Sequence, residues 1–418
     1  MNSNNIEQKF RTEWHKCRLD EICDVIDSLH KSPKYVEVGY PMIRVKDMKE
    51  GYLTFEDTAY VTKDVFNEFN KKHKPKKGDI LFSRVGSYGI TTYVNTNKEF
   101  CLGQNTVVIS NFSKSINNKY LYYYLISNQV KEQIEKYVTG STQKTISMKS
   151  IKSFEIMLPT IEEQARIAKV LSDIDDKIET NNEINKKLEE MAQAIFKQWF
   201  VDFEFPNEDG KPYKSSGGEM VESELGIIPE GWKIKELKEV IKFNKGKKPK
   251  IITDKEFDNS KLYLTIDVLN RNSIQYAIND KVVLANKKDI LMVMDGASSG
   301  SLYYGLDGIV GSTLSKLVIN DEYINDDILY YFLKLNEFNI KGHLTGSAIP
   351  HTDKEYVNRL IMCIPNDKEL LVRVTKILSD IREKVIINNE ENSRLIKLRD
   401  ILLPKLMSGE IRVPLGHE

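Results

Sequence analysis

Two stretches of the chain, residues 159–205 and 366–418, carry apolar positions that alternate by three and four, with polar residues between them. Their helical parts, residues 160–200 and 366–406, contain no Gly, and Pro404 is the only Pro in them. So narrow an apolar stripe is typical of a coiled coil, whereas a helix of a globular domain buries a wider face. The pattern therefore predicts one long helix in each stretch, with the two helices paired. The alternative is two surface helices that each pack on their own domain.

The two stripes match each other position by position at a displacement of 207 residues. Two Asn residues stand at equivalent places within each stripe, where a polar side chain costs stability but fixes the register of paired helices. Because both copies carry the same stripe, each is the matching partner of the other. The predicted seam consists of Leu171, Ile174, Ile178, Asn181, Asn185 and Leu188 in the first stretch and Leu378, Ile381, Val385, Asn388, Asn392 and Leu395 in the second.

The sequence similarity between the two copies extends over most of the chain and indicates an internal duplication. Leu171–Ile174 (Leu-Ser-Asp-Ile) recurs as Leu378–Ile381, and other short motifs recur in the same order at displacements of 206 to 210 residues. Short β-branched and aromatic runs before each long helix predict strands, with one shorter helix in each copy, over Asn118–Gln133 and Asp326–Asn336. We therefore expect an α+β fold, in which two pseudo-symmetric mixed α/β domains are separated by two long helices.

The domain plan that follows has five parts. The stretch between the copies, residues 206–229, is rich in Pro, Gly and Ser, a composition typical of a linker. The expected parts are a globular domain at 1–158, a long helix at 159–205, the linker at 206–229, a second globular domain at 230–365, and a second long helix with a C-terminal tail at 366–418.

The charge of the chain averages to zero but is unevenly distributed. Its 418 residues include 61 Lys and Arg and 61 Asp and Glu. Residues 14–158 carry 22 basic against 16 acidic side chains, whereas residues 159–229 carry 8 against 16. Two Lys-rich runs, residues 71–77 and 245–250, are suited to contact phosphates as point charges. The predicted phosphate contacts are Lys74, Lys76, Lys247 and Lys248; the alternative is that both runs are ordinary solvated loops.

The sequence lacks the motifs of several catalytic and metal-binding classes. It has no GxxxxGK[ST] loop for ATP phosphates, no HExxH or other metal-ligand spacing of His, and no Asn-Pro-Pro-aromatic motif of an amino-methyltransferase. Four Cys without CxxC spacing argue against disulfides and zinc. Because no segment suits a membrane helix or a signal peptide, we expect a cytoplasmic protein. These absences favour a non-catalytic binding protein in which the two globular domains, called heads below, make the contacts.

Three stretches at the ends of the long helices go beyond general patterning. Leu158–Leu171 opens the first helix, Ala194–Phe205 closes it, and Leu402–Val413 ends the second. Together with the duplication and Gly231-Trp232 before the second globular segment, they resemble the DNA specificity subunit of type I restriction–modification systems. The resemblance covers nearly the whole chain. It departs at Ile364–Glu369, a degraded version of the Leu-Pro-x-x-x-Glu-Gln sequence that opens the first helix.

The resemblance implies a subunit with no catalysis of its own that selects the DNA sequence, while other subunits methylate adenine or cut the DNA. The two globular domains then correspond to target recognition domains. The implied partners are double-stranded DNA, two methyltransferase subunits and restriction subunits; S-adenosylmethionine, ATP and Mg²⁺ are expected on the partners, with no cofactor in this chain. The alternatives are a stand-alone DNA methyltransferase or nuclease with an unrecognised site, and a coiled-coil adaptor for other proteins.

The layout also predicts the form of the DNA target. A pseudo-twofold relation between the copies makes the long helices antiparallel and places the globular domains at opposite ends. A helix of about 40 residues is about 60 Å long, somewhat under two turns of B-DNA. We therefore expect a bipartite, asymmetric target, in which two dissimilar heads read two short tracts across an unread gap that the helix length sets.

Polar loops at corresponding places in the two heads are the candidates for contacting bases. Arg can bond guanine through two atoms, and Gln or Asn can bond adenine in the same way. Gly-Ser turns let the backbone approach phosphates, and the alternative for each residue is a structural turn. The candidates are Arg84, Ser87, Tyr88, Gln104, Asn105, Ser141, Thr142, Gln143 and Lys144 in the first head and Ser298, Ser299, Thr313, Ser347 and His351 in the second.

An aromatic cluster at the end of the first long helix is larger than a coiled coil needs. It consists of Trp199, Phe200, Phe203 and Phe205. One interpretation is a docking face for a methyltransferase subunit, and the other is packing against the neighbouring globular segment, since aromatic clusters serve both purposes.

Overall fold

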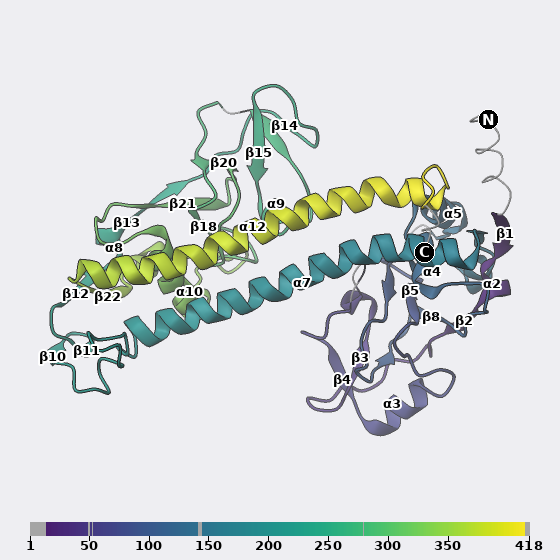
Figure 1. Cartoon of the computed structure of the whole chain (residues 1–418), viewed down its shortest axis with the longest axis horizontal. Helices are drawn as coiled ribbons and strands as arrows, with labels where there is room; N and C mark the ends of the chain where they lie inside the picture. The colour runs from purple at the N-terminus through teal and green to yellow at the C-terminus, as the bar shows by residue number, and fades with distance from the viewer. Residues whose placement is uncertain (1–13, 49–50, 52, 141–143, 279, 414–418) are drawn as a thin grey trace. The chain divides into compact units, whose positions relative to one another are not determined.

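The computed structural model of the chain describes residues 14–48, 51, 53–140, 144–278 and 280–413. These residues form two compact units. The first unit runs to Glu179 and is completed by the segment from Asn392 onward, whereas the second is continuous from Thr180 to Glu391. Both long helices, α7 (Ile161–Phe200) and α12 (Lys368–Met407), therefore contribute one part to each unit (Figure 1).

The first unit contains two small sheets and a two-stranded ribbon. Its four-stranded sheet has the order β2-β8-β5-β6 with antiparallel neighbours, its three-stranded sheet has the order β4-β3-β7, and β1 pairs with β9. The strands are β1 His15–Arg18, β2 Asp24–Asp27, β3 Tyr40–Ile43, β4 Ala59–Val61, β5 Ile80–Ser83, β6 Thr91–Tyr93, β7 Cys101–Leu102, β8 Thr106–Ser110 and β9 Glu155–Leu158. The shorter helices are α2 Leu19–Ile22, η1 Val45–Asp47, α3 Lys63–Phe69, α4 Asn118–Leu125, α5 Asn128–Tyr137 and α6 Met148–Lys152.

The second unit repeats this plan with a larger second sheet. Its four-stranded sheet has the order β13-β21-β18-β19, a five-stranded sheet has the order β14-β16-β15-β20-β17, and β12 pairs with β22. The strands are β10 Met220–Ser223, β11 Gly226–Pro229, β12 Trp232–Glu236, β13 Ile241–Lys245, β14 Ile252–Thr253, β15 Ser260–Leu264, β16 Tyr276–Ile278, β17 Leu284–Ala285, β18 Ile290–Val293, β19 Leu302–Tyr303, β20 Gly308–Val310, β21 Leu314–Ile319 and β22 Ile361–Pro365. The shorter helices are α8 Leu237–Val240, α9 Ile266–Leu269, α10 Asp326–Gly342 and α11 Lys354–Asn358.

The helix expected over Asn118–Gln133 is two helices, α4 and α5. Its first part forms as expected, since Asn117 Oδ1 accepts a hydrogen bond from Tyr120 N (3.0 Å) and Tyr120–Leu125 are all buried. The break lies at Ser127, whose Oγ donates to Tyr124 O (2.6 Å) and whose backbone is extended. A hydroxyl bond of this kind competes with the helical ladder.

The matching helix of the second unit has no such break. Leu335 stands where the first copy has Ser127, 208 residues earlier, and α10 runs without interruption to Gly342, past its expected end at Asn336. The two copies therefore differ at this helix because one has a hydroxyl where the other has an apolar side chain.

The long helices begin at side-chain caps. Thr160 Oγ1 accepts from Glu163 N (3.3 Å) ahead of α7, and Asp367 Oδ1 accepts from Glu369 N (2.8 Å) ahead of α12. Asp367 thus supplies a cap although the sequence around it departs from the opening of the first helix. Pro404 lies inside α12 and does not end it.

The segment at 206–229, expected to be a linker, is folded. Strands β10 and β11 form an antiparallel hairpin, and Tyr213 N donates to Phe205 O (2.9 Å). The rings of Phe205 and Tyr213 stack at 4.5 Å, and Ile228 is buried in the core of the second unit. The Gly and Ser residues of this segment serve tight turns, so its composition was misleading.

The end of α12 completes the core of the first unit. Leu406 and Met407 are 2% and 1% exposed and belong to the same apolar cluster as Leu171 of α7. Beyond the helix, Arg412 Nη1 contacts Glu163 Oε1 at 2.8 Å, and the Arg412 guanidinium lies 5.4 Å from the centre of the Trp14 ring. The first unit is therefore assembled from residues far apart in the sequence.

Replacing Phe196 with Ala should lower the free energy of unfolding of the second unit by about 3–5 kcal/mol, because the change removes a large, fully buried ring. Phe196 is 1% exposed and stacks on Phe200 at 4.6 Å. The matched control is Met191→Ala on the same helix, where the side chain is 53% exposed and the expected change is within about 0.5 kcal/mol. Denaturant unfolding followed by circular dichroism measures both, and equal losses would contradict the assigned packing.

Candidate nucleic-acid interface

The polar loops of the first unit that the sequence singled out lie against one another. Arg84 N donates to Asn105 O (2.8 Å), and Gly86 N donates to Lys144 O (3.1 Å). These bonds join the loop after β5 to the loop before β8 and to the segment after α5. Ser141, Thr142 and Gln143 lie outside the described residues. The structure thus brings together Arg84, Asn105 and Lys144 from separate parts of the chain.

The second unit builds the same three-loop cluster. Met294 N donates to Thr313 O (2.7 Å), and Gly296 N donates to Pro350 O (2.9 Å). Thr345 and His351 form a bridge with two backbone bonds of 2.8 and 2.9 Å. The candidate Thr313 is therefore placed as Asn105 is in the first unit, and His351 is placed as Thr145, the residue after Lys144.

Arg84 is mainly an internal brace. Its side chain is 13% exposed, its Nη1 contacts Asp27 Oδ2 at 2.7 Å, and its Nε donates to Ile146 O at 3.3 Å. Two of its donor nitrogens are thus occupied within the unit. In this conformation the Arg84 guanidinium is not free to form the two hydrogen bonds to guanine that were expected from the sequence.

The other candidates of the first head are more accessible. Ser87 and Gln104 are exposed, and Asn105 has a left-handed backbone with a φ of 70°. Tyr88 donates to Glu135 Oε1 (3.1 Å), and the Lys144 ammonium lies 5.8 Å from the centre of the Tyr88 ring. A positive charge on an aromatic ring at the loop surface is suited to contact with nucleic acid.

The second head contains one candidate that is structural and one that is part of a charged group. Ser299 is 1% exposed and its Oγ donates to Gly296 O and Pro350 O, so it holds the loops together. Ser347 is exposed and Ser298 is half-buried. His351 Nδ1 contacts Asp295 Oδ1 at 2.8 Å, and Lys245 Nζ contacts Asp295 Oδ2 at 2.9 Å.

Asp295 lies in one of the candidate loops of the second head, whereas the first-unit residue Asp27 was not among the candidates. Burial alone would raise the pKa of Asp295, but hydrogen bonds from Lys245 and His351 outweigh it and the pKa of this carboxyl lies below its ordinary value. Both acids become prominent only through partners distant in the sequence, and no local motif points to them. The one local signal is Gly296 beside Asp295, and Asp27 has no neighbouring Gly.

The two Lys-rich runs occupy different places in the two copies. The run at 71–77 precedes β5 and is anchored by buried Asp79, which accepts from Lys76 N (3.0 Å) and lies 2.7 Å from His73 Nε2. The run at 245–250 instead starts in β13. Lys76, Lys247 and Lys248 are exposed, while Lys74 pairs with Glu99. The runs therefore do not support each other as equivalent features, although each remains a candidate for phosphate contact.

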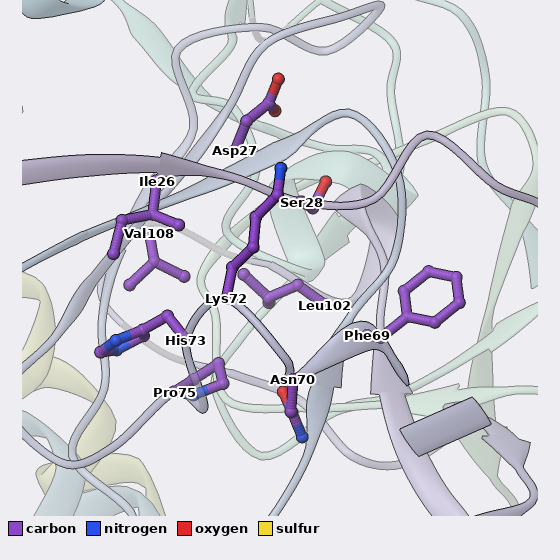
Figure 2. Close-up of a pocket in the computed structure, with 10 residues that line it drawn as sticks. All are labelled: Ile26, Asp27, Ser28, Phe69, Asn70, Lys72, His73, Pro75, Leu102 and Val108. Carbon is purple, nitrogen blue, oxygen red and sulfur yellow. The ribbon is translucent and has the colours of Figure 1, made fainter. Parts of the chain in front are cut away.

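A small cavity of about 10 Å³, enough for roughly one water molecule, lies beside Asp27. Figure 2 shows its lining, which includes Ser28 from the end of β2 and Asn70, Lys72 and His73 from the end of α3 and the loop after it. Asp27 Oδ1, Ser28 Oγ and Asn70 Oδ1 are buried without a hydrogen-bond partner among the described residues. The acidic end of the Arg84–Asp27 pair therefore faces the interior of the first unit.

The polar positions of the helical seam are buried in the second unit. Asn388 Nδ2 donates to Asn185 Oδ1 (2.8 Å), Asn185 Nδ2 donates to Asn389 Oδ1 (3.0 Å), and Asn181 Nδ2 donates to Glu391 Oε2 (2.8 Å). Residue numbers rise along α7 as they fall along α12, so the two helices run in opposite directions here. Asn181 and Asn388 are 1% and 2% exposed.

The same opposite direction holds in the first unit. Arg399 Nη1 contacts Asp175 Oδ1 at 3.0 Å, and Asp175 Oδ2 accepts from Tyr123 OH of α4 at 2.7 Å. Burial, followed by the negative charge of Asp175, raises the pKa of Tyr123. Asp175 thus joins both long helices to the globular part of this unit. Leu171 and Ile174 of the predicted seam are buried, while Ile178 and Leu395 are half-buried.

The aromatic cluster packs inside the second unit. Trp199, Phe200, Phe203 and Phe205 are 6–9% exposed and belong to its main apolar core. Trp232 lies within 5.3–5.7 Å of Phe200, Phe203 and Phe205, measured between ring centres. The structure therefore has the packing arrangement, and these rings do not form an exposed docking face.

The described part of the chain has neither a candidate membrane span nor a candidate metal site. None of its helices is long and apolar enough to cross a membrane. Among the same residues, no three His, Cys, Asp or Glu side chains are grouped so that they could hold a metal ion.

The sequence matches the family model described as the type I restriction modification DNA specificity domain, over residues 11–190 and 229–397. The type I restriction enzyme MjaIX specificity subunit of Methanocaldococcus jannaschii is 27% identical, over 97% of this chain and 95% of that protein. The HindI specificity subunit of Haemophilus influenzae is 26% identical, over 80% of this chain and 87% of that protein. The match to the family model occurs twice, once in each copy of the duplication.

A solved structure has the same fold. The crystal structure of the type I restriction-modification system S subunit from M. genitalium covers 97% of this chain and 98% of its own, with a TM-score of 0.58 and 19% identity. The fold is therefore the mixed α/β fold with two repeats that the duplication predicted.

Replacing Asn185 alone with Leu should lower the free energy of unfolding by about 1–3 kcal/mol, because the amide of Asn388 loses its acceptor in a buried place. Replacing Asn185 and Asn388 together should restore most of that loss, since both polar partners are then gone. Denaturant unfolding of the two single variants and the double variant measures the coupling. Losses that simply add would show that the two side chains do not depend on each other.

Proposed function

This chain belongs to the family of type I restriction–modification DNA specificity proteins, and we propose that each of its two heads reads one part of a bipartite, asymmetric DNA target. As a specificity subunit, it directs its complex to a DNA sequence. The proposal adds that the sequence has two tracts, one for the three-loop cluster of each head, separated by a stretch that neither head reads.

The observation that carries this proposal is the repeated loop cluster. Each head joins three loops with equivalent backbone bonds, from Arg84 to Asn105 in the first and from Met294 to Thr313 in the second. The side chains on the two loop clusters differ, so the heads would contact different bases. The exposed residues Gln104 and Ser87 in the first and His351 and Ser347 in the second are the proposed contacts, with Lys76, Lys247 and Lys248 on phosphates.

The long helices would act as the spacer between the two tracts. Helices α7 and α12 each contain 40 residues, which corresponds to about 60 Å at 1.5 Å per residue. Their opposite directions within each unit support one antiparallel coiled coil along the whole length, with buried Asn181, Asn185, Asn388 and Asn392 fixing its register.

The chemistry would reside on partner subunits. We propose that two methyltransferase subunits and the restriction subunits bind this chain, and that S-adenosylmethionine, ATP and Mg²⁺ belong to them. The relatives named above are specificity subunits, and this supports a chain without a catalytic centre of its own. Because the aromatic cluster at 199–205 is buried, the docking surface would lie elsewhere.

The proposal is tested by mapping modified adenines in a host that produces this chain with its cognate methyltransferase subunits. We expect methylation at one bipartite sequence with a constant gap, and none when this chain is omitted. Methylation at a continuous sequence would contradict the two-part target. S-adenosylmethionine turnover by the purified chain alone would contradict the assignment of catalysis to partners.

Adding one heptad to both helices, between Glu179 and Thr180 and between Glu391 and Asn392, should lengthen the unread gap by about three base pairs. Seven residues add about 10 Å of helix, and B-DNA rises about 3.4 Å per base pair. The map of methylated adenines gives the new gap directly. The matched control carries the heptad in α7 only, which mispairs the helices and should abolish methylation. An unchanged gap in the double insertion would show that helix length does not set it.

A further inference from the structure

The first strand of the main sheet ends at equivalent points in the two heads. Asp27 of β2 lies opposite Val107, which lies opposite Phe82 of β5. Lys245 of β13 lies opposite Ser315, which lies opposite Met292 of β18. Because the strand orders and registers of the two four-stranded sheets coincide, Asp27 and Lys245 occupy equivalent positions in them.

These equivalent positions carry opposite charges, and each is paired with the loop that follows the strand two places along the sheet, β5 in the first head and β18 in the second. In the first head the strand supplies the acid and the loop supplies the base, Arg84, at 2.7 Å. In the second head the strand supplies the base and the loop supplies the acid, Asp295, at 2.9 Å. The charges of strand and loop are thus exchanged between the heads, although Asp295 stands one residue beyond Met294, the counterpart of Arg84.

The two pairs also differ in accessibility. Arg84 is 13% exposed and Asp27 is 22% exposed, and Asp27 Oδ2 also contacts His30 Nε2 at 2.9 Å. In the second head Lys245 and His351 are 50% and 47% exposed, and Asp295 between them is 27% exposed. The two acids are therefore exposed to a similar degree, whereas Lys245 is far more exposed than Arg84, so the group in the second head is the more accessible to a ligand.

The carboxylate of Asp295 has remaining acceptor capacity. Oδ1 accepts from His351 and Oδ2 contacts Lys245, but an ionised carboxylate offers about four acceptor sites. The two basic neighbours offset its charge and reduce its repulsion of DNA phosphates. A carboxylate donates nothing, so the base atoms that it can bind are the exocyclic amino groups of cytosine (N4) and adenine (N6) in the major groove.

We propose that Asp295 is a specificity-determining residue of the second head, accepting a hydrogen bond from the exocyclic amino group of one base in its half-site. The inference rests on the function proposed above and adds the chemical class of the base atom. Lys245 and His351 orient the carboxylate. The corresponding Arg84–Asp27 pair of the first head makes no such contact and holds the loops in place.

The test uses the assembled complex with its methyltransferase subunits and a series of target duplexes that each lack one exocyclic amino group. Purine replaces adenine, or 2-pyrimidinone replaces cytosine, at one position at a time. For the wild-type complex, one such duplex should bind about 10-fold more weakly or worse, since a hydrogen bond to a charged acceptor is lost. Whether the sensitive position is an adenine or a cytosine identifies the base.

The same series with Asp295→Ala should show no loss at that position, while sensitivity elsewhere is kept. The matched control is Asp254→Asn, a change at an exposed acid of the same head, which should retain the full pattern of sensitivity. Asp295→Asn should relax the methylated sequence at one base pair of one half-site and leave the other half-site and the gap unchanged. An Asp295→Ala complex that keeps the wild-type sensitivity would overturn the proposal.

Two further outcomes separate this inference from the proposed function. If the Asp295 variants do not assemble, the wild-type series still decides, because sensitivity to no amino group in either half-site overturns the inference. If the wild-type complex does not distinguish its target from an unrelated duplex, the proposed function itself fails. A uniform fall in binding to all duplexes with Asp295→Asn would assign a structural role and also overturn the inference.

Discussion

The narrow apolar stripe of each long helix has to be buried, and this constraint determines how the chain is assembled. A helix with such a stripe gains little from packing on one globular domain, so each half of α7 lies against half of α12 within a unit. Leu171 and Leu378, at equivalent places in the two stripes, are both completely buried. The seam is polar at its Asn positions, where hydrogen bonds such as Asn185–Asn388 satisfy the buried amides. The globular part of each unit is joined to these helices by polar contacts, such as Tyr123 of α4 with Asp175 and Asp327 of α10 with Arg382.

The two copies have kept the same buried apolar positions, but charged residues at equivalent positions differ in sign. Asp175 accepts from Tyr123 in the first unit, and 207 residues later the second unit has Arg382, which pairs with Asp327 at 2.7 Å. A buried apolar position has to match the shape of its whole surroundings, so it changes little between copies. An ion pair has to match only one partner, and both members can change together. Each head is consequently fitted to its own pair of helix segments.

Features with a short sequence period could be predicted from the sequence, and features that depend on distant partners could not. The stripe around Leu171 has a local period, and the repeated motifs locate both heads and their loops. The break at Ser127 depends on a single hydroxyl, and the hairpin at 206–229 on the contact of Phe205 with Tyr213. The roles of such residues follow from neighbours that only the folded chain brings together. The same holds for Arg84, whose partner Asp27 is 57 residues away.

The composition of the first unit has a consequence for synthesis on the ribosome. The second unit is continuous from Thr180 to Glu391, whereas the first needs Leu406 and Met407 for its core and Arg412 to pair with Glu163. Domains usually fold in the order in which they emerge. Here the first unit cannot close until residues 406–412 have been synthesised, so the second unit reaches its native packing earlier. A chain released before residue 392 would contain a complete second unit and an open first one, and quality-control proteases would recognise it by the unburied apolar side chains around Leu171.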